Sequence, residues 1–223
     1  YRERRLEICF PYIPPSTFHL PPSTFLSTIK LAASVIVTRG HNDHLNVLLV
    51  RRAPEMSFFG GYWVFPGGNV SAADRHGPDD SLEHVLHRCA IRELNEETCL
   101  ECDEMQPVCR ITTPPFYPVR VETQFFLTQM PSGVEPHLGG SELTDFGFFD
   151  PTDAVHAWER GAMEIAPPVL FLLRELARHG RLQFPAQAAA TAATFETVGV
   201  HPAYFSPGMF VAPLRTPTLP PAT

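Results

Sequence analysis

The 223-residue sequence lacks any apolar run near the roughly 20 residues that a membrane-spanning helix requires. Its first residues also lack the apolar core of a secretory signal peptide. We therefore expect no membrane association and a cytoplasmic location.

The sequence has no excess of positive charge, with 17 Lys and Arg residues against 24 Asp and Glu residues and a net charge of −7. This balance argues against a protein that binds the nucleic-acid backbone, because such proteins carry a basic surface. It leaves phosphate chemistry open, since bound metal ions can supply positive charge locally. The apolar fraction of 44% and the length suit one globular domain with appended segments.

Cysteine is scarce, and its odd count of five favours a reducing compartment over a disulfide framework. Cys99 and Cys102 have the spacing of a metal-binding pair, but no second pair lies nearby. We interpret this pair as incidental.

Proline and alanine mark the two ends of the chain. Residues 1–27 are rich in proline and repeat PPSTF at 14–18 and 21–25, which predicts an extended N-terminal arm. Residues 181–223 are dominated by alanine and then proline, which predicts a tail or linker with little packing capacity. The predicted domain is therefore residues 28–180.

Hydrophobic patterning within this domain predicts strands that alternate with helices. The predicted strands are 29–38, 45–51, 62–65, 108–113, 119–129 and 145–149. The predicted helices are 81–98, 150–160 and 163–178, the last beginning at Pro167 and Pro168. This order predicts an α/β (α+β) domain.

The helix predicted near residues 81–98 carries two different faces. Asp80 and Glu83 have capping-box spacing, so the helix should begin near Ser81. The apolar face would contain Leu82, Val85, Leu86, Cys89, Ala90 and Leu94. Glu93, Glu96 and Glu97 are spaced i, i+3 and i+4, so their like charges cluster on another face. A hard divalent cation such as Mg²⁺ would remove that repulsion.

Gly68, Arg92-Glu93-Leu94 and Glu96-Glu97, preceded by Phe65-Pro66-Gly67, form a pattern that resembles the Nudix hydrolase signature, G-x5-E-x7-R-E-U-x-E-E-x-G-U, where U is aliphatic. The resemblance implies an α/β/α sandwich with a mixed central sheet. It also implies that Glu93, Glu96 and Glu97, with Gly67, hold Mg²⁺ or Mn²⁺, and that Arg92 orients the carboxylates.

The sequence departs from this signature in three ways. Arg92 lies 24 positions after Gly68 instead of 14, so about ten residues are inserted before the helix. The position eight before Arg92 is His84 instead of glutamate. Cys99 replaces the glycine after the helix, so we expect the helix end to be built differently.

The run LLVRRAPEMSFFGGYWVFPGG resembles the coenzyme A diphosphatase branch of the family, which includes mitochondrial and peroxisomal members. An organelle matrix is therefore the alternative location. Arg51 and Arg52, with Phe65, Gly67 and Gly68, are the candidate substrate-binding residues. Coenzyme A or acyl-coenzyme A is the expected substrate, with ADP-ribose, NADH and dinucleoside polyphosphates as alternatives. Nudix enzymes are often dimers, so a homodimer is also expected.

Hydrolysis of a pyrophosphate needs a carboxylate that takes a proton from water. The candidates are Glu97, Glu142 and Glu122, in that order, with His84 a weaker one. A different hypothesis is a catalytically weak Nudix module that binds a nucleotide for regulation, and the changes at His84 and Cys99 motivate it.

Overall fold

The computed structural model describes residues 29–40, 45–112 and 120–179. The predicted N-terminal arm (1–27) and C-terminal tail (181–223) lie outside these residues, so the domain limits stay predictions. None of the helices within the described ranges is long and apolar enough to cross a membrane.

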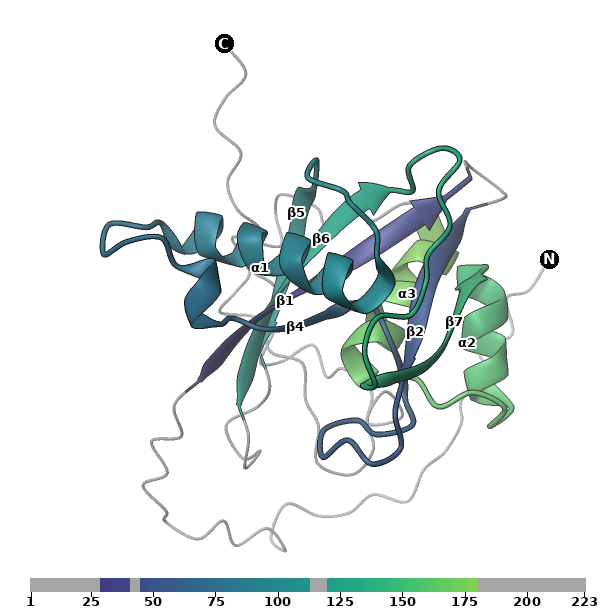
Figure 1. Ribbon diagram of the computed structural model, residues 1–223. Coiled ribbons are helices and arrows are strands. Elements are labelled where there is room, and N and C mark those ends of the chain that lie inside the picture. Colours follow the sequence, from purple (N-terminus) through teal and green to yellow (C-terminus); the bar gives the residue numbers. More distant parts are fainter. Residues whose placement is uncertain (1–28, 41–44, 113–119, 180–223) are drawn as a thin grey trace, which may run out of the picture.

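The described residues form seven strands, a short 3₁₀ turn and three helices (Figure 1). The strands are β1 (Lys30–Arg39), β2 (Asn46–Arg52), β3 (Trp63–Val64), β4 (Gly67–Asn69), β5 (Gln106–Thr112), β6 (Val121–Gln129) and β7 (Leu143–Phe149). The helices are α1 (Leu82–Thr98), α2 (Pro151–Glu159) and α3 (Pro167–His179), and the 3₁₀ turn is η3 (Ala72–Asp74).

One mixed sheet holds all seven strands, in the order β3-β2-β1-β6-β5, with β4 paired to β1 and β7 paired to β2. Strand β1 runs parallel to β6 and antiparallel to β2 and β4. The start of β1 pairs with β4, whereas its end pairs with β2. This splaying of β2 from β4 lets the short strand β4 lie directly under α1.

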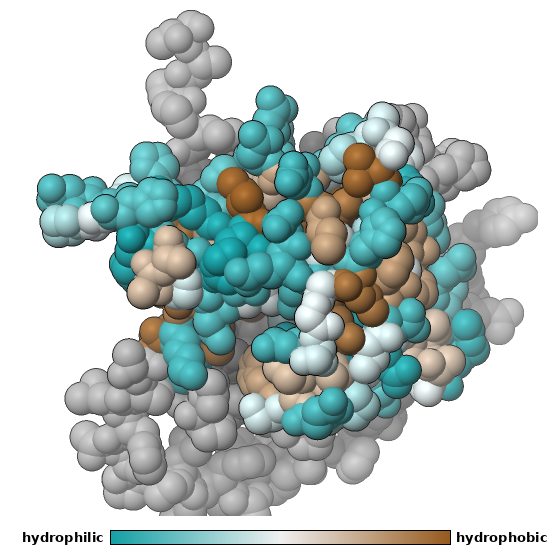
Figure 2. Space-filling model, viewed as in Figure 1, coloured by the Kyte–Doolittle hydropathy of each residue, from teal (hydrophilic) through white to brown (hydrophobic). Residues whose placement is uncertain are grey.

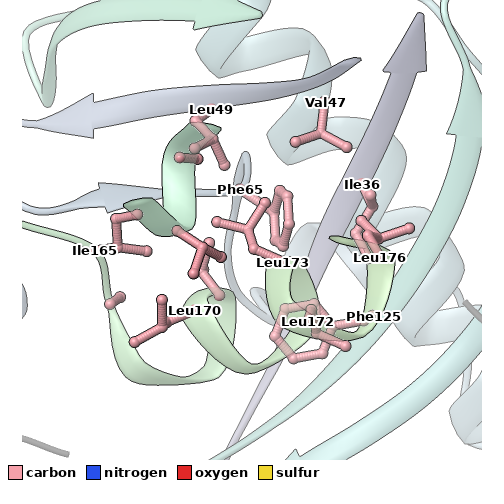
Figure 3. Close-up of a cluster of buried hydrophobic side chains, with 14 of the residues drawn as sticks. Ile36, Val47, Leu49, Phe65, Phe125, Ile165, Leu170, Leu172, Leu173 and Leu176 are labelled. Carbon is pink, nitrogen blue, oxygen red and sulfur yellow. The ribbon is translucent and has the colours of Figure 1, made fainter. Parts of the chain in front are cut away.

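The sheet separates two apolar cores, with α1 on one face and α2 and α3 on the other (Figure 1). Leu86, Ala90 and Leu94 of α1 pack on alternate residues of β1 such as Val35. The opposite core contains the predicted line of Leu170, Leu173 and Leu176 from α3 (Figure 3). The α/β/α sandwich with a mixed sheet is thus confirmed.

Most predicted elements appear with their ends shifted by one or two residues, but three details differ. Strand β4 and turn η3 were not predicted, because a Gly-Gly pair has low strand propensity. Ser81, and not Asp80, caps α1 by accepting a hydrogen bond from the His84 amide. Leu82 is 39% exposed, because the first turn of α1 adjoins the exposed residues 75–79 and extends beyond the buried stripe.

Candidate active site

Strand β4 brings two glycines against the acidic face of α1. The Gly67 amide donates a 2.8 Å hydrogen bond to Glu97 Oε2. A β-carbon built on Gly68 would lie 2.5 Å from the Glu93 carboxylate. The absence of side chains on β4 therefore lets two carboxylates of α1 lie directly against its backbone.

Arg92 forms hydrogen bonds with three acidic side chains of the site. Its Nη1 donates to Glu93 Oε1 at 2.9 Å and to Glu96 Oε2 at 2.8 Å. Its Nε and Nη2 donate to the two carboxylate oxygens of Asp74 at 2.8 and 2.9 Å, and Nη2 also reaches the Asn69 carbonyl. These contacts raise the pKa of Arg92, with the Asp74 hydrogen bonds as the largest cause. Arg92 thus orients two of the predicted metal ligands through charge-assisted bonds.

Asp74 belongs to this group of side chains, and the sequence reasoning missed it. It is 2% exposed, and its Oδ2 accepts hydrogen bonds from the Ser71 amide and hydroxyl. Burial alone would raise the pKa of Asp74, but the bonds and charge of Arg92 and the bonds from Ser71 lower it to about 2. The carboxylate therefore stays charged and paired with Arg92.

The position of Asp74 corrects our assignment of His84 to the place of the signature's first glutamate. Asp74 lies six residues after Gly68, where the signature has its first glutamate, so the extra residues fall between Asp74 and Arg92. His84 does not stand in for that glutamate, because it is exposed on the first turn of α1. Counting forward from Gly68, instead of back from Arg92, would have found Asp74.

Glu97 is the most deeply buried carboxylate of the three, at 8% exposed. Burial raises the pKa of Glu97 to about 8, which the Gly67 amide opposes. The charges of Glu93 and Glu142 raise this pKa further and that of Arg52 lowers it. Burial also raises the pKa of Glu93. The site thus gathers carboxyl groups where water solvates their charged forms poorly.

The loop of residues 135–142 holds the C-terminal end of α1. The His137 amide donates to the Thr98 carbonyl and the Gly139 amide to the Glu97 carbonyl, both at 2.9 Å. The Glu142 carbonyl accepts from the Ala53 amide, which ties the loop to the end of β2. Contrary to our expectation, α1 ends in the usual left-handed conformation, with Cys99 at φ 55° in place of glycine.

The two candidate arginines at the end of β2 have different surroundings. Arg51 is exposed, and its Nε donates to the Gly61 carbonyl at 3.2 Å. Arg52 lies close enough to Glu97 to lower its pKa. The Nε of Arg52 is buried and has no hydrogen-bond partner among the described residues. An unsatisfied buried donor is costly, so this atom is available for an anionic ligand.

Two other candidates contact residues outside this group. Glu122 accepts from Arg110 and Thr112 on the neighbouring strand β5, at 3.4 and 3.3 Å. The Phe65 side chain is 2% exposed and packs edge-to-face on Phe125 in the core beneath α3 (Figure 3). The Phe65 ring is therefore part of the core, and its contact with a substrate stays a prediction.

The carboxylates of α1 have the chemistry that a divalent cation needs. Across residues 29–40, 45–112 and 120–179, no three His, Cys, Asp or Glu side chains already surround one point as metal ligands. One carboxylate oxygen each of Glu93 and Glu96 accepts a hydrogen bond from Arg92, and one oxygen of Glu97 accepts from the Gly67 amide. In the described part of the chain, the second oxygen of each carboxylate has no hydrogen bond. Hard carboxylate oxygens of this kind suit Mg²⁺ or Mn²⁺.

A comparison with known families identifies this arrangement. The profile described as the NUDIX domain matches residues 28–169, which is more than half of the chain. The chain belongs to the Nudix family. It is therefore an enzyme of the Nudix hydrolase type, and the general reaction of the family is hydrolysis of pyrophosphate bonds in nucleoside diphosphate derivatives. Nudix hydrolases generally require divalent metal ions and bind small nucleotide substrates.

Solved structures agree with this assignment. A NUDIX hydrolase from Alicyclobacillus acidocaldarius superposes with a TM-score of 0.59 at 25% identity, covering 69% of this chain and 93% of its own. The NUDIX domain of Shewanella oneidensis NrtR, complexed with ADP ribose, gives 0.52 at 20% identity, covering 76% and 94%. A MutT protein from Methanosarcina mazei gives 0.52 at 16% identity, covering 71% and 99%. Among curated proteins, none matches the sequence.

Proposed function

We propose that this Nudix hydrolase cleaves the pyrophosphate bond of coenzyme A or an acyl-coenzyme A, in a reaction that depends on Mg²⁺ or Mn²⁺. The observation that carries the catalytic part is the group of Glu93, Glu96 and Glu97 on α1. Arg92 and the Gly67 amide hold these three carboxylates, and each keeps an oxygen that no other described residue hydrogen-bonds.

The side chains of α1 would hold the metal, with the backbone of Gly67 beside them. A bound divalent cation neutralises charge on the phosphoryl group and lowers the pKa of a coordinated water. Glu97 is the first candidate to accept the proton of the attacking water, because it is a buried carboxylate within the group. Glu142 is the second candidate, since its charge is close enough to raise the pKa of Glu97. Glu122 is the third, because its carboxylate is already paired with Arg110.

Arg52 is the proposed contact for a substrate phosphate. Its Nε is buried and without a partner in the described residues, and its charge lies near Glu97. A guanidinium suits a phosphate, because its planar donors match two oxygens. Arg51 already donates to the Gly61 carbonyl, so its role is secondary.

The choice of coenzyme A rests on the resemblance of residues 48–68 to the coenzyme A diphosphatase branch. Hydrolysis of coenzyme A would give 4′-phosphopantetheine and adenosine 3′,5′-bisphosphate, and hydrolysis of an acyl-coenzyme A would give the acylated 4′-phosphopantetheine instead. ADP-ribose, NADH and dinucleoside polyphosphates share the reacting bond and differ in groups remote from it. They therefore remain the alternative substrates.

The test is turnover of coenzyme A, acetyl-coenzyme A, ADP-ribose, NADH and diadenosine tetraphosphate, with and without Mg²⁺ or Mn²⁺. We expect metal-dependent turnover, fastest with the coenzyme A compounds and lost in Glu97→Gln. The matched control is Glu175→Gln on α3, on the opposite side of the sheet, which should keep full activity. Faster turnover of ADP-ribose would refute the substrate assignment alone. Nucleotide binding without turnover would instead favour a regulatory module.

A further inference from the structure

The insertion between Asp74 and Arg92 extends into α1, and we call its part before the helix, residues 75–81, the inserted segment. A second arginine, Arg88, connects this segment to the helix. Arg88 Nε donates to the Asp74 carbonyl at 2.8 Å, and Arg88 Nη2 contacts Asp80 Oδ2 at 2.5 Å. The same Asp80 oxygen accepts from the His76 amide at 2.6 Å. One arginine therefore holds the segment at its beginning and near its end.

Arg88 and Arg92 lie one helical turn apart and share Asp74 as a partner. Arg92 binds the carboxylate of Asp74, whereas Arg88 binds its backbone carbonyl. Residues at i and i+4 lie on the same side of a helix, so both arginines face the turn η3. Helix α1 thus binds both the backbone carbonyl and the side-chain carboxylate of Asp74.

We propose that Arg88, together with Asp80, is a positioning residue for the metal-binding carboxylates. Arg88 keeps Asp74 in place, Asp74 keeps Arg92 in place, and Arg92 orients Glu93 and Glu96. This inference rests on the proposed metal-dependent function.

The insertion gives the physical reason for this arrangement. The family signature leads from its first glutamate to its arginine in eight positions, whereas Asp74 and Arg92 are 18 positions apart. A longer exposed connection restrains its ends less, and residues 75–79 are all exposed. The surface over α1 and this segment is mainly hydrophilic (Figure 2), so apolar packing supplies little restraint. The polar contacts of Arg88 supply it instead.

Burial separates these contacts from an ordinary surface ion pair. The side chains of Arg88 and Asp80 are 26% and 15% exposed, and the Arg88 bond reaches the backbone of a residue that is 2% exposed. By contrast, Arg178 on α3 pairs with Glu175 at 3.5 Å and is 61% exposed. Exposed pairs of the latter kind contribute little to stability.

The test measures Mn²⁺ binding without substrate, by the electron paramagnetic resonance signal of the free ion, together with kcat and KM for the best substrate. Changing a residue that supports metal ligands typically weakens metal binding or activity by roughly tenfold to a hundredfold. For Arg88→Ala we expect the Mn²⁺ dissociation constant to rise roughly tenfold and kcat to fall roughly tenfold, with KM nearly unchanged. Arg178→Ala is the matched control and should equal the wild type.

A double variant decides whether Arg88 acts through Asp74. If it does, Arg88→Ala combined with Asp74→Asn should bind Mn²⁺ no more weakly than Asp74→Asn alone. Asp80→Asn, a milder change, should fall between Arg88→Ala and the wild type. Hydrogen exchange of the Ser71 amide, which donates to Asp74, should speed up in Arg88→Ala.

Two results would overturn the proposal. One is wild-type Mn²⁺ affinity in Arg88→Ala. The other is a double variant whose Mn²⁺ dissociation constant rises by the product of the two single-variant factors. A wild type that binds Mn²⁺ without hydrolysing any substrate would refute the proposed function, and the Mn²⁺ measurements would still test Arg88. A wild type that binds no Mn²⁺ would refute both.

Discussion

Gly67 and Gly68 are adjacent, yet a β-carbon on each would meet a different kind of neighbour. At Gly67 it would overlap the backbone of Ala33 and Ser34, which cannot move without disturbing β1. At Gly68 its nearest neighbours would be the carboxylate atoms of Glu93, which form the end of a flexible side chain. We therefore expect Gly67→Ala to lower the unfolding free energy by roughly 1–3 kcal/mol. Gly68→Ala should keep the fold and lose Mn²⁺ affinity and activity.

Urea denaturation and Mn²⁺ titration of both variants check this contrast. Gly77→Ala is the control, because no atom lies within 4 Å of the added carbon. Equal losses of stability in Gly67→Ala and Gly68→Ala, or full activity in Gly68→Ala, would show that this account of β4 is mistaken.

At the residue level, the sequence predicted those side chains that lie close together because of their spacing along the chain. Glu93, Glu96, Glu97 and Arg92 lie within six positions on one helix, so helical geometry alone brings them together. Asp74 could have been assigned from its spacing to Gly68, whereas Arg88 could not, because its contact with Asp74 spans the inserted segment. The left-handed end at Cys99 was also missed, since an L-residue adopts it at a cost of roughly 1–2 kcal/mol.

At the level of elements, backbone hydrogen bonds join the loop of residues 135–142 to the end of α1. A β-carbon on Gly139 would overlap the Glu96 carbonyl oxygen, so Gly139→Ala must separate the loop from the helix. We expect a loss of roughly 1–3 kcal/mol in unfolding free energy from this clash. Because the loop leads into Glu142, kcat should fall as well.

Urea denaturation and steady-state kinetics test this prediction, with Ser141→Ala, an exposed position of the same region, as the control. Wild-type stability in Gly139→Ala would mean that the loop does not depend on its close approach to α1.

The elements that were predicted well are those with a strong hydrophobic period. Helices α1 and α3 bury one regular face each, and that face is visible in the sequence. Strand β6 is buried on both faces, and it was predicted from its run of β-branched and aromatic residues. Strand β4 has no such period, because it consists of Gly67, Gly68 and Asn69. It forms because β1 offers it an open edge, which is tertiary information that a local pattern does not contain.

At the scale of the whole molecule, the pairing of Asp74 with Arg92 links the stability of the domain to pH. The pKa of Asp74 falls from 3.8 to about 2 on folding, so the folded state favours the charged form. This contribution is fully present above the unfolded pKa and is lost as pH falls through about 2. The shift corresponds to about 2 kcal/mol of unfolding free energy at neutral pH.

Denaturation of wild type and Asp74→Asn from neutral pH down to about pH 2 measures this term. The difference between the two proteins should be largest at neutral pH and should shrink below about pH 4, where the unfolded Asp74 begins to take up a proton. A difference that stays constant with pH would mean that the charge of Asp74 does not stabilise the fold.

The attachment of the inserted segment also has a practical use in protein engineering. Residues 75–79 are exposed, while Asp74 and Asp80 on either side of them are bound to Arg92 and Arg88 of one helix. Doubling the length of a flexible loop costs only about 0.6 kcal/mol, so the tip at Gly77 should accept a foreign peptide. An epitope or fluorescent tag could thus be displayed beside the catalytic helix while both anchoring contacts stay intact.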